Sequence, residues 1–133
     1  MQANNALSYD YSVAKCFTHA TILFGIIGML IGVVIAYQMA FPELNYLAGE
    51  YGTYSRLRPL HTSGVIFGFL LSGIFAAWYY IGQRVLKVSM AESPFLMIVG
   101  KLHFWLYMIL MTIAVVTLFM GIGTSKEYAE HEW

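Results

Sequence analysis

The sequence has little charge and almost no cysteine. Of its 133 residues only 11% are charged, and seven Lys and Arg balance seven Asp and Glu, so the formal net charge is zero. A soluble domain carries about 25% charged residues, and a nucleic-acid-binding protein needs a basic surface. The one cysteine, Cys16, excludes an internal disulfide framework and a cysteine-based zinc or iron–sulfur site. Hydrophobic residues make up 59% instead, which indicates a membrane protein with no nucleic-acid partner.

Three long stretches contain no charged residue, namely 16–42, 59–83 and 102–125. They are 27, 25 and 24 residues long, and a helix needs roughly 20 apolar residues to cross a membrane. They lack the alternation of a barrel strand, and an isolated segment in lipid must satisfy its own backbone hydrogen bonds. We therefore predict an all-α membrane protein that forms a single unit over 1–133, with transmembrane helices near Phe17–Phe41, His61–Gly82 and Leu102–Gly123.

Prolines and basic residues flank these predicted helices. Pro42 is expected just after the first helix and Pro59 just before the second, where proline is best tolerated. The basic residues near the helix ends set the expected orientation, because cytoplasmic loops carry an excess of Lys and Arg. One face holds Lys15, Arg84, Lys87 and Lys101, and the other holds Arg56, Arg58 and Lys126. Four against three favours a cytoplasmic N-terminus.

The most informative stretch runs from Arg56 to Gly64, with the sequence RLRPLHTSG. It brings two arginines to the outer membrane face just before His61, which is expected to open the second helix. Gly64, Gly68 and Ser72 follow at helical spacing and are expected to share its face. A haem could lie in such a groove with its iron on the imidazole and its propionates on the guanidinium groups. However, small-residue stripes in membranes more often seat a neighbouring helix, so both interpretations stay open.

The other histidines offer weaker sites. His19 and His103 are expected at the inner face, where they could pair on one iron, but Lys101 is the one cation nearby. His131 lies in an acidic tail and is interpreted as solvated, although its depth would allow it to reach an iron held by His61. A second stripe of small residues in the first helix is interpreted as a packing surface: Gly25, Gly28, Gly32 and Ala36. We assign no role to Cys16.

Familiar catalytic patterns do not occur in the sequence. It has no glycine-rich phosphate loop, no paired acid–base carboxylates and no serine triad. No carboxylate lies within a predicted helix, so these three helices alone cannot form an intramembrane proton relay. We therefore name no catalytic residue.

Several segments resemble the start of the catalytic subunit of cbb3-type cytochrome c oxidases, which belong to the haem-copper oxidase family. The most specific is RLRPLHT at 56–62. Others follow in the same order and spacing: YDYSV at 9–13, Gln83-Arg84 after WYY at 78–80, KLHFW at 101–105 and TSKEYAE at 124–130.

This resemblance implies that the chain is part of a larger transmembrane helical bundle. It implies that His61 is one axial ligand of a low-spin haem b, and that Arg58, together with Arg56, contacts the haem propionates. Electrons would come from cytochrome c through c-type cytochrome subunits and pass to a high-spin haem–copper centre that reduces oxygen to water and pumps protons. The expected location is the bacterial cytoplasmic membrane, with lipid around the helices.

The remaining haem and copper ligands of that family belong to later helices. We therefore expect this chain to be an N-terminal portion, from an incomplete or split gene, that has no oxidase activity alone. Two alternatives stay open. The chain could be a small b-type haem electron carrier, standalone or as a homodimer in which two copies of His61 share one iron. It could also be a cofactor-free membrane scaffold.

Overall fold

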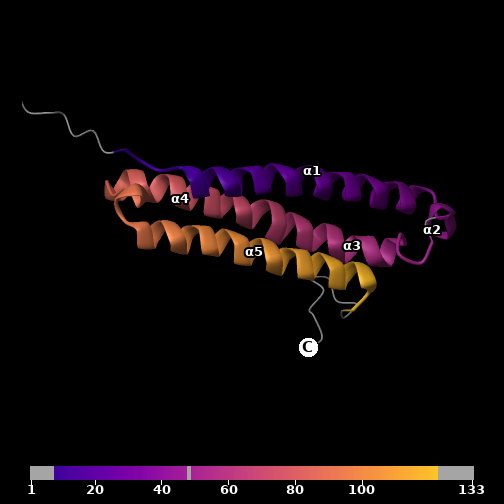
Figure 1. Ribbon diagram of the computed structural model, residues 1–133. Coiled ribbons are helices and arrows are strands. Elements are labelled where there is room, and N and C mark those ends of the chain that lie inside the picture. Colours follow the sequence, from indigo (N-terminus) through magenta and orange to yellow (C-terminus); the bar gives the residue numbers. More distant parts are fainter. Residues whose placement is uncertain (1–7, 48, 123–133) are drawn as a thin grey trace, which may run out of the picture.

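The computed structural model describes residues 8–47 and 49–122, and three long helical spans dominate it (Figure 1). The elements in chain order are α1 (Ser12–Ala40), α2 (Leu44–Leu47), α3 (Tyr54–Ser63), the π-helix η1 (Gly64–Leu71), α4 (Ser72–Leu86), the 3₁₀-helix η2 (Met90–Glu92) and α5 (Pro94–Met120). α3, η1 and α4 run on without a break and form the second span, Tyr54–Leu86. All three spans are long and apolar enough to cross a membrane, which confirms the predicted transmembrane helices.

The helices begin earlier than predicted. α5 starts at Pro94 rather than near Leu102, and the hydroxyl of Ser93 caps it by accepting the Leu96 N–H at 3.4 Å. The second span starts at Tyr54, so Pro59 lies inside the helix and His61 does not open it. The absence of charge marks only the hydrocarbon core of the membrane. A helix can continue into the polar region until a capping residue or a turn ends it.

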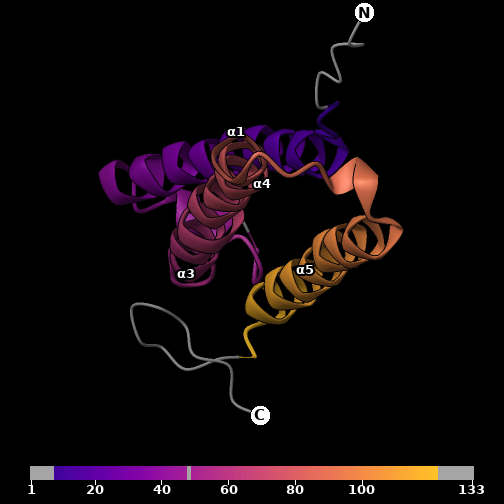
Figure 2. The same cartoon turned by 90° about the vertical axis from the view of Figure 1, so that its left-hand side faces the viewer.

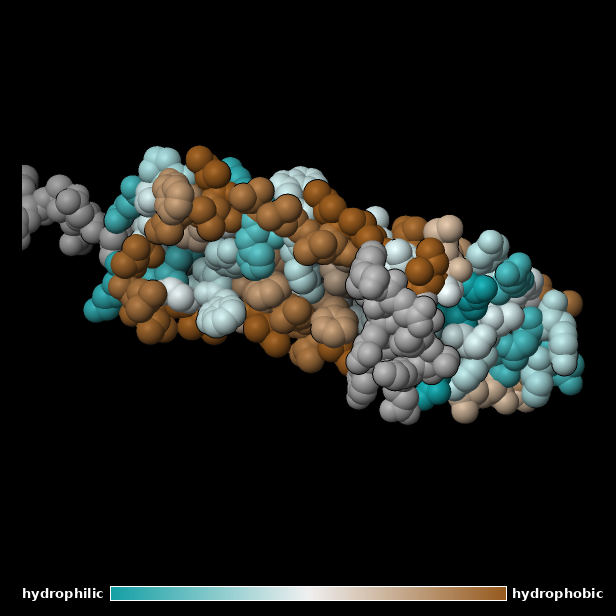
Figure 3. All heavy atoms as spheres, turned by 90° about the horizontal axis from the view of Figure 1, so that it is seen from below, coloured by the Kyte–Doolittle hydropathy of each residue, from teal (hydrophilic) through white to brown (hydrophobic). Residues whose placement is uncertain are grey.

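α1 packs along the whole second span, and α5 lies on another side of that span (Figure 2). We name the two ends of the bundle after the short elements in the loops, as the α2 end and the η2 end. An apolar cluster of Val13, Phe17 and Met90 lies toward the η2 end, and Leu60 packs on Leu118 toward the α2 end. Figure 3 shows hydrophilic residues gathered at the α2 end and mostly hydrophobic residues over the spans.

α1 and the second span approach each other closely along three glycines of α1. A Cβ atom added at each would press on one side chain of the second span: Phe69 for Gly25 (2.9 Å), Val65 for Gly28 (3.1 Å) and His61 for Gly32 (2.7 Å). The packing role predicted for this stripe is therefore confirmed for its three glycines. Its fourth member, Ala36, is exposed.

The π-helix changes which residues of the second span face α1. The side chains that follow His61 toward α1 are Val65 and Phe69, at intervals of four residues. The prediction that Gly64, Gly68 and Ser72 share the face of His61 is wrong for Gly64, whereas Gly68 does face α1. Gly64 lines an apolar cavity of about 360 Å³ against α5, whereas Gly68 contacts Phe24 of α1. The prediction assumed the α-helical repeat, and i→i+5 hydrogen bonding gives a wider turn.

The Gly68→Ala variant tests this close packing. A Cβ at Gly68 would lie 2.8 Å from the ring of Phe24 and 3.1 Å from its Cβ, so the two helices must move apart. We expect a loss of about 1–3 kcal/mol in stability, measured as a lower unfolding temperature of the purified protein in detergent. Gly82→Ala is the matched control, because nothing lies within 4 Å of its added Cβ. Equal unfolding temperatures for the two variants would contradict the packing described.

Candidate functional site

His61 lies between α1 and the second span, with its ring against the glycines of α1. Its Nδ1 atom is 2.7 Å from the carbonyl oxygen of Gly28. Because a carbonyl can only accept, Nδ1 carries the hydrogen, and in the neutral imidazole Nε2 then keeps its lone pair. Among the described residues Nε2 has no hydrogen-bond partner. A ring N–H donated to a backbone carbonyl is the arrangement that fixes metal-binding histidines in place.

Arg56 lies near the start of the second span, at the α2 end, where Glu50, Tyr51 and Gly121 surround its guanidinium group. Its Nη2 is 3.6 Å from Glu50 Oε1, and the guanidinium lies 5.6 Å from the ring centre of Tyr51. The guanidinium also lies so close to Gly121 that a Cβ there would overlap it. Its Nη1 atom is buried and has no partner among the described residues. A buried donor without a partner is costly, so this nitrogen is suited to bind an added acceptor.

Arg58 is exposed and lies three residues before His61 in the same helix, α3. Residues three apart in a helix lie on neighbouring turns of one face. Its backbone carbonyl accepts a hydrogen bond from the Thr62 hydroxyl at 3.1 Å.

These residues fit one half of a haem site. The imidazole of His61 offers a fixed ring with a bare Nε2, and the two guanidinium groups offer donors that match carboxylates. Within residues 8–47 and 49–122, no group of three His, Cys, Asp or Glu side chains comes together as a metal site.

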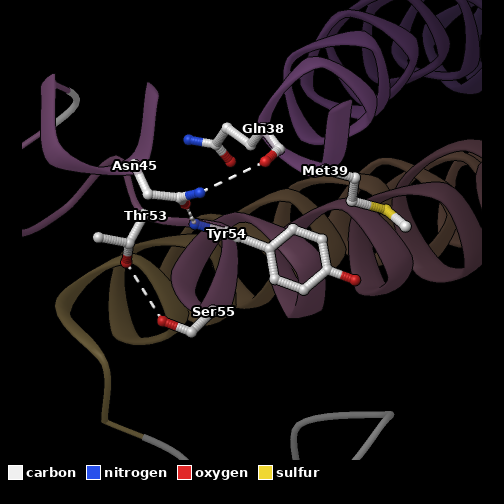
Figure 4. A pocket seen from close by; sticks show the side chains of 6 residues that line it. All are labelled: Gln38, Met39, Asn45, Thr53, Tyr54 and Ser55. Carbon is white, nitrogen blue, oxygen red and sulfur yellow. Dashed lines mark hydrogen bonds between the residues drawn. The ribbon is translucent and has the colours of Figure 1, made fainter. Parts of the chain in front are cut away.

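A second polar feature of the α2 end is an open hollow of about 550 Å³ (Figure 4). The amide of Gln38 donates to the Gly52 carbonyl at 2.6 Å, and Asn45 accepts the Tyr54 N–H at 2.9 Å. These bonds fold the loop between α1 and α3 back onto α1. The Oε1 atom of Gln38 is buried and without a partner in the described part of the chain.

The two other described histidines, His19 and His103, lie apart from His61. His103 Nδ1 is 2.9 Å from the Tyr79 hydroxyl, and its ring packs on Phe17 and Phe75. His19 is exposed, and the described residues give no contact between it and His103. Cys16 is exposed with a free thiol. His131 and the TSKEYAE segment at 124–130 lie outside the described residues.

Sequence reasoning missed a polar cluster at the η2 end, centred on Gln83. Its Nε2 donates to the Asp10 carbonyl at 2.7 Å, and its Oε1 accepts the Met90 N–H at 3.1 Å. Ser89 donates to the Ser8 carbonyl at 2.5 Å. Gln83 and Ser89 are both buried. A glutamine at the end of an apolar run was the available signal. Two of the segments that carry the family resemblance, at 9–13 and at Gln83-Arg84, meet in this cluster.

Asp10 begins this cluster just before α1. The backbone N–H of Ser12 donates to its carboxylate at 2.7 Å and lowers the pKa of the carboxyl group, with a smaller contribution from Lys101. Arg84 donates to the Tyr11 hydroxyl at 3.1 Å. The segment before α1 is thus tied to the end of α4.

Comparisons with known proteins agree with the resemblance stated above. Residues 12–133 match the family model of Cytochrome C and Quinol oxidase polypeptide I. The whole chain is 38% identical to the cbb3-type cytochrome c oxidase subunit CcoN1 of Stutzerimonas stutzeri. Over 94% of its length it is 38% identical to a cytochrome c oxidase subunit 1 homolog of Agrobacterium tumefaciens and 39% identical to cytochrome c oxidase subunit 1 of Rhodobacter capsulatus. The chain spans about a quarter of these relatives' length, namely 27%, 22% and 23%.

The Gln83→Leu variant tests the η2-end cluster. Leucine fills similar space but leaves the Asp10 carbonyl and the Met90 N–H without their partner. We expect faster amide hydrogen exchange over residues 8–12 and 88–92, measured by mass spectrometry on the protein in detergent. Lys87→Gln is the control, because Lys87 is exposed. Unchanged exchange in Gln83→Leu would contradict the role assigned to Gln83.

Proposed function

The chain belongs to the cytochrome c and quinol oxidase polypeptide I family, and we propose that it supplies one axial ligand of the low-spin haem b in a cbb3-type cytochrome c oxidase. Proteins of this family are membrane oxidoreductases that use haem and copper in their complete form. The observation that carries the proposal is the geometry of His61. Its Nδ1–H is held by the Gly28 carbonyl, and its Nε2 is left to bind iron.

The arginines complete this half of the site. A haem bound by His61 would direct its two propionates toward the α2 end, where Arg58 and the buried Nη1 of Arg56 would donate to them. Their positive charge would offset the propionate charge near the membrane surface. The His61 ring occupies the space that a side chain at Gly32 would need, so a larger residue there would displace the imidazole. Iron that is bound here supplies one-electron transfer.

The relatives are about four times as long as the 133 residues given, and the rest of the oxidase activity is proposed for the complete enzyme. In the complete enzyme, electrons from cytochrome c would arrive through c-type cytochrome subunits. The residues of this site would then hold the haem that passes them to the oxygen-reducing haem–copper centre, coupled to proton pumping. The protein would lie in the bacterial cytoplasmic membrane with its N-terminus in the cytoplasm and its α2 end outward.

The test is loss of one haem signal in the oxidase as the source cell assembles it. We expect His61→Ala to abolish the low-spin haem b band in the reduced-minus-oxidised spectrum, because the iron loses its axial nitrogen. His19→Ala is the control and should keep the band, since His19 is exposed on α1. A preserved band in His61→Ala would refute the proposal. In the unsubstituted protein, one haem for every two chains would favour a homodimeric electron carrier, and the absence of haem would favour a scaffold.

A further inference from the structure

The π-helix η1 begins three residues after His61. It covers Gly64–Leu71 and joins α3 to α4 within one continuous span. π-helical turns are rare and frequently occur at functional sites. The N–H of Gly64, its first residue, donates to the carbonyls of both His61 and Leu60. The backbone of His61 is therefore bonded directly to the first residue of η1.

This wider turn keeps the second span in register with the glycines of α1. Phe69 lies on Gly25, Val65 on Gly28 and His61 on Gly32. In a continuous α-helix Phe69, eight residues after His61, would lie roughly 80° away from the face of His61. Loss of η1 would turn the following residues by about one helical position, or roughly 100°. The ring contacts that hold His61 against Gly28 and Gly32 would change with it.

A tyrosine of α5 contacts the middle of η1. The hydroxyl of Tyr107 donates a hydrogen bond to the Phe67 carbonyl oxygen. The Tyr107 ring is fixed by Phe75, whose ring centre is 5.3 Å away, and by Phe17 at 6.0 Å. Inside a membrane no water satisfies a backbone carbonyl that a change of helical pattern releases. Tyr107 provides a side-chain donor to this carbonyl.

We propose that Tyr107 is a positioning residue for His61, because its hydroxyl stabilises η1 and so fixes the orientation of the imidazole. The proposal rests on the proposed function of His61 as a haem ligand. Tyr107 does not contact Nε2 of His61, so α5 would act on the haem site only through η1. Ser72, which has no exposed surface and follows η1 directly, would move into a new environment if the register changed.

The test is Tyr107→Phe in the oxidase assembled by the source cell. We expect unchanged haem content but shifted g values of the oxidised low-spin haem in electron paramagnetic resonance, because these depend on the orientation of the axial imidazoles. Tyr37→Phe is the control. Tyr37 is exposed on α1, and its hydroxyl has no hydrogen bond within the described residues. Native g values in a fully loaded Tyr107→Phe enzyme would overturn the proposal.

A second variant covers the case in which Tyr107→Phe fails to assemble. Tyr107→4-aminophenylalanine restores an N–H donor at the position of the hydroxyl and should restore both assembly and the native g values. If it does not, the hydrogen bond to Phe67 is not what matters and the proposal fails. His61→Ala separates the two claims. Loss of the haem in His61→Ala together with native g values in Tyr107→Phe would leave the proposed function standing and refute only the positioning role.

Discussion

The structure depends on the close approach of α1 to the second span. Three glycines, Gly25, Gly28 and Gly32, remove side-chain bulk from one face of α1, and one side chain of the second span fills each space. In a membrane such contacts are favourable chiefly because they pack backbones closely and allow hydrogen bonds between helices. Here the closest contact also brings the Gly28 carbonyl within 2.7 Å of His61. The same packing that joins the helices thus selects the protonated nitrogen of the imidazole.

His61, Val65 and Phe69 all pack on α1, which requires the second span to keep three residues spaced by four on one face. An α-helix cannot keep side chains at intervals of four on a straight line over several turns, because its repeat is 3.6 residues. The π-helix η1 relaxes this limit between His61 and Ser72. The π-helix disturbs the backbone hydrogen-bond pattern, and each unpaired backbone N–H or C=O group in lipid costs several kcal/mol. The Tyr107 hydroxyl donates a hydrogen bond to the Phe67 carbonyl within η1, so α5 also contributes to this arrangement.

The sequence predicted the three membrane-spanning helices because charged side chains are costly in lipid and therefore mark where a span is interrupted. It also predicted the packing role of the α1 glycines, whereas the role of His61 as a haem ligand stays a prediction. Helix ends were predicted poorly, as Tyr54 and Pro94 show, because helices end at caps in the polar region rather than at the last apolar residue. The predicted groove was wrong at Gly64, because the prediction assumed an unbroken α-helical repeat. The Gln83 cluster was missed because its partners are backbone groups, which no side-chain pattern reveals.

The two ends of the bundle differ in how completely their polar groups are satisfied. At the η2 end, Gln83 and Ser89 are buried, and their side chains bond to backbone atoms of the preceding segment and the loop. At the α2 end, Gln38 Oε1 and Arg56 Nη1 are buried without a partner among the described residues, beside an open hollow. Unsatisfied buried groups are costly unless something else binds them. The η2 end is therefore closed by the chain itself, whereas the α2 end keeps two buried polar atoms that no described residue satisfies. That is the end toward which the propionates of the proposed haem would point.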